Sequence, residues 1–360
     1  MKIAPVKTNE EHKLLSRWIL VTLIVLPLVT VGTVRAQEDT DAARAQVSAQ
    51  DRASIYSLSN FRFHILPANT KAGKASAAAR TLTAMPESHG SAQTSRTASV
   101  PTLPSPGFYP ADLSFFGGNV VTTVESHDIY LNCASTCWGN PAGFLIDLGK
   151  SKFIHLVDQY VNTTSNNRYT KGKSVSLQET LFTNTLGQND LLAIVHAAAV
   201  QLAATGYDHI FHVFLPQGVD TCFDLTNVCY SPDNPSTFFF CAYHGSVDFS
   251  DIGHVLLTVE PYQAVSGCEV APPNPNSELA DSTNSVISHE LFETITDPDP
   301  PTGWVANSSL DEQGFEIGDL CQPIGNQNFQ FLTPTFPLNG KKYELQLEYS
   351  NQFHGCANVP

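Results

Sequence analysis

Residues 284–321, NSVISHELFETITDPDPPTGWVANSSLDEQGFEIGDLC, hold the pattern on which the interpretation of this chain depends. The apolar side chains that recur every four residues are Ile287, Leu291 and Ile295. This spacing predicts a helix with one buried face. His289 and Glu293 are also four residues apart, so the helix brings their side chains to a common face, roughly half a turn from the apolar one. Asp297-Pro298 and Asp299-Pro300 are expected to end the helix, because proline blocks its continuation.

An imidazole and a carboxylate on adjacent helical turns are the ligands that one metal ion takes from a metallohydrolase helix. Glu316, in the segment EIGDLC, is the expected third ligand and Asp319 is the alternative; the sequence does not decide between them. Glu290 follows the first ligand and is the expected general base, which takes a proton from water that the ion polarises. Zn²⁺ is the expected ion, but Glu293 stands where a second histidine is usual, so Ca²⁺ and Mn²⁺ stay open.

Two classes of function fit such a site. The first is a zinc metallopeptidase, or a related hydrolase, that acts on an extracellular peptide or protein. The second is a non-catalytic extracellular module, in which the same carboxylates hold calcium or a structural ion at a cell surface or in signalling. The position of Glu290 favours the hydrolase, and the surplus of Asp and Glu around the site favours the ion-binding module. The alternative to a metal site is an ordinary solvent-exposed Glu-x-x-Glu face of the helix that binds no ion.

Other histidines and one tyrosine are weaker candidates for functional groups. His244, Tyr262 and His354 are weak candidates for the donor that steadies an oxyanion, and each is expected more often to be structural. His209 and His212 lie in a predicted strand, 207–215. Because they are three residues apart, they point to opposite faces and do not form a metal pair.

The first 36 residues resemble a secretory signal peptide. Basic residues precede an apolar run over 18–34, and Val34-Arg35-Ala36 is a fair cleavage site. An uncleaved membrane anchor is the alternative, although Pro27 interrupts the run, which is shorter than the roughly 20 residues of a membrane span. The expected location is extracellular or periplasmic, with no membrane contact after cleavage.

Residues 37–105 are rich in Ala, Ser, Thr, Gln and Arg and hold few large apolar side chains. Such a segment buries too little surface to offset its ordering entropy, which predicts a disordered linker or a pro-segment. The short patch 55–66 is expected to form at most a transient element. A role in latency is conceivable, but not through a thiolate, since the segment has no cysteine.

Charge and cysteine content agree with export. The formal charge of the chain is −15; residues 1–36 carry five Lys or Arg and two Glu, so the remainder carries −18. This balance excludes nucleic acid and anionic membranes as expected partners. The eight cysteines, all after residue 36, predict four disulfides. From proximity alone the expected pairs are Cys133–Cys137, Cys222–Cys229, Cys241–Cys268 and Cys321–Cys356. The last pair would fix the loop that carries the third ligand.

Residues 106–360 are long enough for one domain with a substantial core. The pattern predicts an α+β fold: a single zincin-like domain with a mixed sheet, an active-site helix and disulfide-linked loops. Strands are expected at 120–124, 144–146, 207–215, 238–244 and 254–262, a helix at 188–205, and a C-terminal hairpin over 329–349 that turns at Asn339-Gly340. Asp281 or Ser282 is the expected N-cap of the metal helix.

Several short motifs, in this order, resemble the phosphate-induced, EXORDIUM-like family of secreted proteins. They are Phe115-Phe116-Gly117-Gly118, Cys241-Ala242-Tyr243-His244-Gly245, Glu260-Pro261-Tyr262 with Cys268, Ser288-His289-Glu290, and Glu316-Ile317-Gly318-Asp319-Leu320-Cys321. In plants the resemblance implies an apoplastic protein linked to cell expansion and brassinosteroid-responsive growth, with no settled enzymatic activity. Many plant members lack the His-Glu-x-x-Glu pattern, so this chain looks more like microbial relatives with a zincin-like helix.

Overall fold

The computed structural model describes residues 61–70, 73, 112–178, 184–223, 227–306, 315–322 and 333–360. Every described residue belongs to one compact unit of the chain. The predicted signal peptide, its alternative as an anchor, and the predicted boundaries at residues 36 and 105 therefore lie outside the described residues.

The central sheet has seven strands in the order β1-β10-β11-β7-β3-β4, with β5 also paired to β3. Their bounds are β1 Arg62–Pro67, β3 Val124–Leu131, β4 Tyr169–Lys171, β5 Val175–Leu177, β7 Gly206–Phe214, β10 Phe240–Phe249 and β11 Gly253–Glu260. Strands β1, β10 and β11 are antiparallel neighbours, whereas β11, β7 and β3 run parallel, as do β3 and its partners β4 and β5. The sheet is mixed and the fold is α+β, as the sequence predicts.

Four α-helices belong to the described chain: α3 Pro141–Gly149, α4 Asp158–Val161, α5 Gln188–Leu202 and α6 Glu278–Thr296. Short strand pairs surround them: β2 Leu113–Phe115 with β12 Trp304–Ala306, β13 Thr335–Leu338 with β14 Lys341–Glu344, and β15 Glu348–Ser350 with β16 Gly355–Ala357. A small sheet is formed by β6 Thr185–Gly187, β8 Asp220–Cys222 and β9 Cys229–Tyr230. One-turn 3₁₀ helices are η3 Ser135–Trp138, η4 Phe153–Val157 and η5 Asp319–Cys321.

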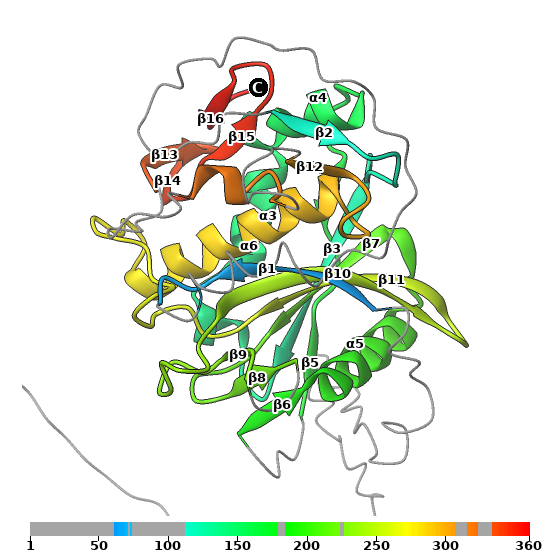
Figure 1. Ribbon diagram of the computed structural model, residues 1–360, viewed down its shortest axis with the longest axis vertical. Coiled ribbons are helices and arrows are strands. Elements are labelled where there is room, and N and C mark those ends of the chain that lie inside the picture. The colour runs from blue at the N-terminus through cyan, green and yellow to red at the C-terminus, as the bar shows by residue number, and fades with distance from the viewer. Residues whose placement is uncertain are drawn as a thin grey trace, which may run out of the picture. The chain divides into compact units, whose positions relative to one another are not determined.

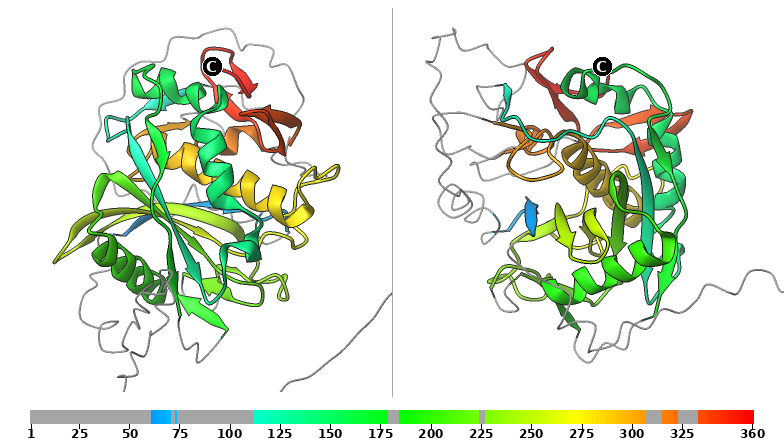
Figure 2. Two further views of the ribbon diagram at one scale, coloured as in Figure 1. Left: turned by 180° about the vertical axis from the view of Figure 1, so that it is seen from behind. Right: turned by 90° about the vertical axis from the view of Figure 1, so that its right-hand side faces the viewer.

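The central sheet separates two hydrophobic cores, because alternate residues of a strand point to opposite faces. Tyr130 of β3 and Phe214 of β7 join the core that contains α6, whereas Ile129 and Phe211 of the same strands join the core that contains α5. Figure 1 shows α6 above the sheet and α5 below it. Both views of Figure 2 keep this order and show the C-terminal strands β13–β16 on the far side of α6. Helix α6 is therefore enclosed between the sheet and the C-terminal strands.

Helix α6 begins four or five residues earlier than the sequence predicts. Its N-cap is Ser277, whose hydroxyl accepts a hydrogen bond from the backbone N–H of Ala280 at 3.1 Å. The predicted caps are buried inside the helix, where Asp281 accepts hydrogen bonds from the loop residue Asn276. The helix ends at Thr296, before Asp297-Pro298, as predicted. Its residues from Ala280 to Thr296 are all buried, so the polar face is not a solvent face.

Two predicted strands of the sequence are wrong. Residues 144–146 belong to α3, because Asn140 caps a helix that starts at Pro141, a position where proline is favoured. Residues 120–124 precede the strand rather than form it, since β3 begins at Val124. The polar residues 125–128 interrupt the apolar pattern in the sequence, but residues 125–130 of β3 all pair with β7.

The remaining expected elements are present with shifted ends. The strands predicted at 207–215, 238–244 and 254–262 correspond to β7, β10 and β11. Helix α5 ends at Leu202 instead of residue 205, because Ala203 takes a left-handed conformation, with φ of 51°. The C-terminal hairpin turns at Asn339 and Gly340, which both have positive φ, as a two-residue hairpin turn requires.

Strand β1 lies inside the segment predicted to be a linker, and the structure differs from the prediction there. Residues 62–67 pair antiparallel with β10 and form an edge of the central sheet. Ile65 and Leu66 are buried in the α5-side core. The strand is stable at this edge because its apolar residues pack into a core that the rest of the domain forms. The local composition of the segment does not predict this packing.

The four disulfides pair as the sequence predicts: Cys133–Cys137, Cys222–Cys229, Cys241–Cys268 and Cys321–Cys356. No cysteine is free. The Cys241–Cys268 bond joins β10 to the loop before α6, and Cys321–Cys356 joins η5 to β16. Two of the four bonds therefore hold the surroundings of α6.

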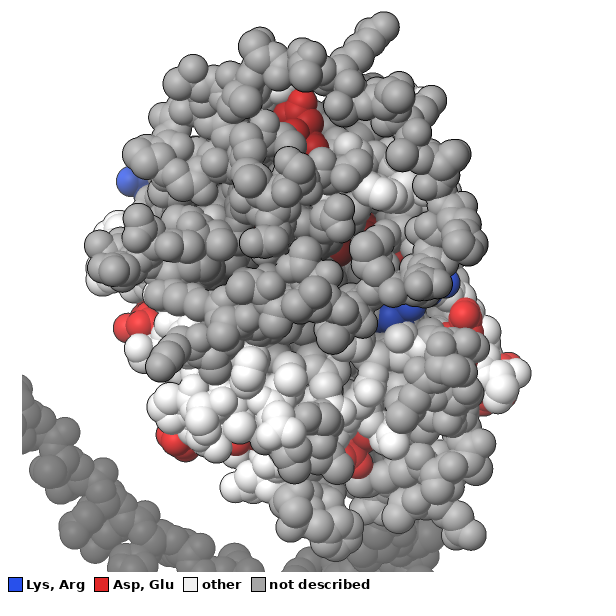
Figure 3. Space-filling model, in the orientation of Figure 1, with Lys and Arg blue, Asp and Glu red and all other residues white. Residues whose placement is uncertain are grey.

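Among the described residues, no helix is both long and apolar enough to span a membrane. The face drawn in Figure 3 has acidic atoms spread among the described side chains and basic atoms at its left and right margins. This distribution agrees with the net charge of −15 and shows no broad basic patch among the coloured atoms of that face.

Candidate functional site

Helix α6 presents His289, Glu290 and Glu293 toward the sheet and toward the loop 315–322. His289 Nε2 is 3.0 Å from Glu293 Oε1, as expected for side chains four residues apart on a helix. The apolar residues Ile287 and Leu291 face the α6-side core instead. The predicted division of the helix into two faces is therefore present, with both faces inside the protein.

Strand β10 adds a second histidine. His244 Nδ1 lies 3.4 Å from Glu290 Oε2 and 3.4 Å from Glu293 Oε2. Its Nε2 is 3.2 Å from the backbone carbonyl of Asp297, at the end of α6. Glu293 thus stands between two imidazoles and contacts each through a different carboxylate oxygen.

The loop 315–322 brings both candidates for the third ligand to this place. Asp319 Oδ1 is 4.0 Å from His289 Nε2, and Glu316 Oε2 is 3.5 Å from His244 Nε2. Gly318 lies between them, and a Cβ there would be only 2.2 Å from His289 Nδ1, so this position requires glycine. The loop is fixed by the Cys321–Cys356 disulfide and by the hydrogen bond from Gln346 Nε2 to the Gly318 carbonyl at 2.6 Å.

A third histidine comes from β1. His64 Nε2 is 2.5 Å from Asp319 Oδ2, and His64 Nδ1 is 3.3 Å from Glu316 Oε1. Figure 1 shows β1 running beside α6 at the edge of the sheet. We call this group the helix centre; its members are His64, His244, His289, Glu290, Glu293, Glu316 and Asp319.

The helix centre is sealed from solvent. His64 is 8% exposed, and the other six residues are 0% exposed. Among the described residues, neither ring nitrogen of His289 has a hydrogen-bond partner, and the same holds for both carboxylate oxygens of Glu290, Glu293 and Glu316. In the described part of the chain, the ion pairs of these carboxylates all involve histidine, and none involves Lys or Arg. Buried carboxylates are normally hydrogen-bonded or paired with positive charge, so this group needs positive charge to balance its carboxylates.

The pKa values reflect the crowding of charge. Burial lowers the pKa of His244 and His289, but the adjoining carboxylates outweigh burial and raise each pKa to about 10. Burial raises the pKa of Glu290 to about 7, although both histidines act in the opposite direction. Burial and neighbouring carboxylates also raise the pKa of Glu316 well above its usual value. The cluster can be neutralised by protons on its imidazoles or by a divalent cation that replaces those protons.

Two subsets of the helix centre have the spacing of metal ligands. They are His64, Glu293 and Asp319, and His244, Glu290 and Glu293; within each, one ligand atom per residue lies within 4.8 Å of the others. Imidazole nitrogens and carboxylate oxygens are the ligand types that zinc and manganese accept. These are possible metal-binding groups; Glu293 belongs to both, and His289 belongs to neither.

The structure brings together every residue that the sequence proposed for the metal site. His289, Glu290, Glu293, Glu316 and Asp319 belong to one cluster. The sequence does not indicate that His64 is a site residue, because the composition of residues 37–105 predicts a linker. For His244 the sequence predicts only a weak role as oxyanion donor. Its position at the end of the predicted strand 238–244 is a feature that could have indicated a site residue.

The other candidate residues of the sequence lie elsewhere. His354 contacts Asp112 at the surface, and Tyr262 contributes its carbonyl to a hydrogen bond from Tyr230. Neither has a contact with the helix centre among those described. His212 bonds Thr258 on the α6 side of the sheet, while His209 bonds His127 on the other side, so this pair is divided as predicted.

Buried carboxylates next to the helix centre were not foreseen. Both oxygens of Glu348, on β15, lack a hydrogen bond, and the side chain is 0% exposed. Glu260, on β11, accepts a hydrogen bond from Thr258 at 2.7 Å and is equally buried. Burial raises the pKa of both, and the charges of Glu290 and other centre residues act on them. The centre therefore has an outer layer of acidic groups.

Comparison of the chain with protein-family models, with curated proteins and with solved structures finds no match in any of the three.

Proposed function

We propose that the helix centre binds one divalent metal ion, with zinc the best fit, and that the protein is a secreted metal-dependent peptidase or related hydrolase. The proposal rests on the buried nitrogen and oxygen atoms, of the kind that ligate metals, that have no hydrogen-bond partner among the described residues. They belong to His289, Glu290, Glu293 and Glu316. Burying such atoms without a hydrogen-bond partner costs on the order of 1–3 kcal/mol each, and a cation would offset this cost.

His289 and Glu293 would hold the ion from α6, and Asp319 would be the third ligand. Asp319 is favoured over Glu316 because Asp319 Oδ1 lies within 4.0 Å of His289 Nε2, whereas the contacts of Glu316 are with His64 and His244. When bound, zinc would polarise a carbonyl and acidify a water molecule.

Glu290 would accept the proton of the attacking water. It follows His289 directly, and its Oε2 contacts His244 Nδ1 at 3.4 Å. His244 would hold the Glu290 carboxylate in place and would be the donor nearest to the negative charge that develops during acyl transfer.

The position of strand β1 indicates which kind of substrate the scaffold could bind. It occupies the antiparallel position on β10, where an extended peptide could add to the sheet beside α6. An extended peptide is thus the substrate that fits the scaffold, and β1 must move before the peptide can bind there. Strand β11, which directly precedes α6, is not available for this role because it is enclosed by β10 and β7.

The non-catalytic alternative is supported by a different observation. The helix centre is 0% exposed at six of its seven residues, which is typical of a structural ion rather than of a site that admits substrate. In this second proposal the ion, zinc or calcium or manganese, fixes η5 and β1 to α6, and the protein acts as an extracellular binding module of the EXORDIUM-like type.

Secretion is part of the proposal. Four disulfides, together with the absence of a membrane-spanning helix among the described residues, are compatible with an extracellular protein. The resemblance to EXORDIUM-like proteins and the zincin-like character of α6 support this interpretation through the same residues, 241–245 and 288–290, that build the centre.

The test compares wild type with Glu290→Gln, Glu293→Gln and the surface control Glu278→Gln, which lies in the exposed first turn of α6. Metal content is measured by elemental analysis and hydrolysis by casein cleavage, before and after proteolytic nicking of the chain between residues 73 and 112. The hydrolase predicts a helix-centre zinc and activity in wild type and control, this zinc without activity in Glu290→Gln, and loss of both in Glu293→Gln. A helix-centre ion in wild type and control, its loss in Glu293→Gln and no cleavage by any protein, nicked or intact, support the structural ion and reject the hydrolase. No stoichiometric metal rejects both.

A further inference from the structure

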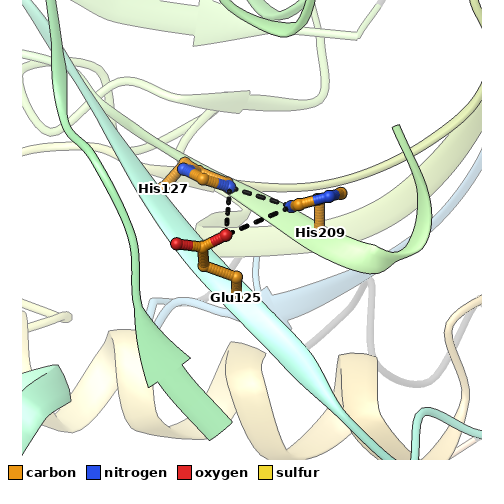
Figure 4. A group of neighbouring side chains, drawn as sticks. All are labelled: Glu125, His127 and His209. Carbon is orange, nitrogen blue, oxygen red and sulfur yellow. Dashed lines mark hydrogen bonds and ion pairs between the residues drawn. The ribbon is translucent and has the colours of Figure 1, made fainter. Parts of the chain in front are cut away.

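A second group of ligand-type side chains lies on the face of the sheet opposite α6. It consists of Glu125 and His127 on β3 and His209 on β7, and we call it the strand cluster. Glu125 and His127 are two residues apart on one strand, so they share a face, and Glu125 pairs with His209 in the parallel ladder. Figure 4 shows the three side chains converging from the two strands. Their meeting follows from strand register alone.

The distances within the strand cluster match a small metal ion. His127 Nε2 and His209 Nδ1 are 3.0 Å apart, and Glu125 Oε2 is 3.8 Å from each of these nitrogens. Three atoms with these separations lie on a circle of about 2.1 Å radius, which equals the usual Zn–N and Zn–O bond lengths of about 2.0–2.2 Å. We propose that the strand cluster is a metal site for a zinc-class divalent ion, independent of the helix centre.

The tautomer of His127 prepares it as a ligand. His127 Nδ1 is 3.1 Å from the backbone carbonyl of Lys173, which only accepts hydrogen bonds, so this nitrogen carries the proton. The lone pair of the neutral ring is then on Nε2, the atom that faces His209 and Glu125. A carbonyl that orients the far nitrogen of the ring is the usual second contact of a metal-binding histidine. The His127 ring is also fixed by Phe211, at 5.2 Å between centroids.

The backbone next to the strand cluster is shaped for it. A Cβ on Gly172 would lie 2.6 Å from the Glu125 carboxylate and 2.6 Å from His127 Cε1, so only glycine leaves room for both side chains. The side chain of His127 is 5% exposed, whereas those of His209 and Glu125 are 26% and 44% exposed. The ion would therefore have protein on one side and solvent on the other, which leaves a coordination position open to water or a small ligand.

The ligand set selects the ion. Two imidazoles and one carboxylate suit zinc and neighbouring transition metals, whereas calcium and magnesium prefer oxygen ligands alone. The competing interpretation is a plain hydrogen bond from His209 Nδ1–H to His127 Nε2, with Glu125 as a nearby charge. That interpretation accounts for the 3.0 Å contact but does not require Glu125 to approach both rings equally.

The experiment uses Zn²⁺ itself as the probe on the full chain. Zinc content and affinity are measured by competition with a chromophoric chelator for wild type, His209→Ala, Glu125→Gln and the control His155→Ala. His155 is a partly exposed histidine 2.9 Å from Asp158, and it has an acid partner but no second imidazole. None of these substitutions touches the helix centre, so the number of ions bound there is the same in all four proteins.

The proposal predicts that wild type and His155→Ala bind one zinc more than His209→Ala, and that Glu125→Gln binds this zinc at least on the order of 100-fold more weakly. Near-ultraviolet circular dichroism verifies folding. If His209→Ala does not fold, Glu125→Gln alone decides. Equal zinc content and affinity in wild type, His209→Ala and Glu125→Gln would overturn the proposal and leave the hydrogen-bonded histidine pair. A loss of the same size in His155→Ala would identify adventitious surface binding and would also overturn it.

Discussion

The helix centre and the strand cluster are two histidine–carboxylate groups on opposite faces of one sheet, and they are built in different ways. The helix centre collects residues from β1, β10, α6 and the segment 315–322, and its carboxylates outnumber its imidazoles. The strand cluster needs only two neighbouring strands in register, and its imidazoles outnumber its carboxylate. The first is buried and the second is partly open to solvent. The two groups therefore differ in burial as well as in ligand type, and only the helix centre places several carboxylates out of contact with solvent.

The largest expected effect separates the two groups by stability. In chelator-treated protein, His289→Ala is expected to lower the free energy of unfolding by about 3–5 kcal/mol, because buried carboxylates lose their nearest cationic partner. His209→Ala is expected to cost less than about 1 kcal/mol, since its contacts are partly exposed. Guanidinium unfolding curves measure both values. Similar losses for the two variants would contradict the difference in burial.

A glycine tests whether β1 closes the helix centre. A Cβ on Gly245 of β10 would lie 2.0 Å from the carbonyl oxygen of Arg62, so Gly245→Ala is expected to loosen β1 at a cost of about 1–3 kcal/mol. Hydrogen exchange should then rise in residues 62–67, and casein cleavage should rise if β1 blocks the substrate. The control is Gly253→Ala, whose site has open space but a positive φ, and which should not change exchange in β1. Unchanged exchange in both would rule out the close packing of β1.

A second glycine tests the strand cluster. Gly172→Ala places a methyl group against the Glu125 carboxylate and His127, and both side chains can move only by leaving their common point. Zinc affinity at this cluster is expected to fall by about tenfold, with a change in stability below about 1 kcal/mol. Chelator competition and thermal unfolding measure the two effects. A large loss of stability with unchanged zinc affinity would show that Gly172 serves packing alone.

The smallest effect comes from a histidine–carboxylate contact outside both groups. Burial lowers the pKa of His254, but Asp299 and Asp248 outweigh burial and raise it above its ordinary value near 6.5. The stabilisation from this pair is therefore fully present below about pH 6.5 and is lost as the pH rises through the raised pKa. His254→Gln should lower the melting temperature at pH 6 by an amount equivalent to at most about 1 kcal/mol, and by less at pH 9.

Asp299 sets the lowest pH at which its ion pair with His254 still stabilises the protein. Burial raises its pKa, but His254, Ser246 and Tyr207 outweigh burial and hold the pKa below its ordinary value. Its contribution is present above about pH 4 and is lost as the pH falls toward the lowered pKa. Melting curves of wild type and His254→Gln should therefore differ most between about pH 4 and 6.5. A difference that grows above pH 7 would contradict the assignment.

The sequence by itself determined several features of this protein. The four-residue spacing of His289 and Glu293 and the prolines after Thr296 were sufficient to predict α6, its polar face and its C-terminal end, because helix geometry is local. The disulfide pairs followed from proximity along the chain, since short loops close most readily. The turn at Asn339-Gly340 was equally local.

Only the tertiary structure decided what surrounds α6. His64 joins the helix centre because the apolar residues of β1 complete a distant core, and this long-range burial leaves no local pattern. Residues 144–146 form a helix rather than a strand because the Asn140 cap and Pro141 start α3, signals that outweigh three apolar residues. The strand cluster depends on the parallel register of β3 and β7, and Glu125, His127 and His209 meet only after the sheet has formed. Spacing along the chain fixes what one helix or turn presents, while partners supplied by other elements are set by packing across the whole domain.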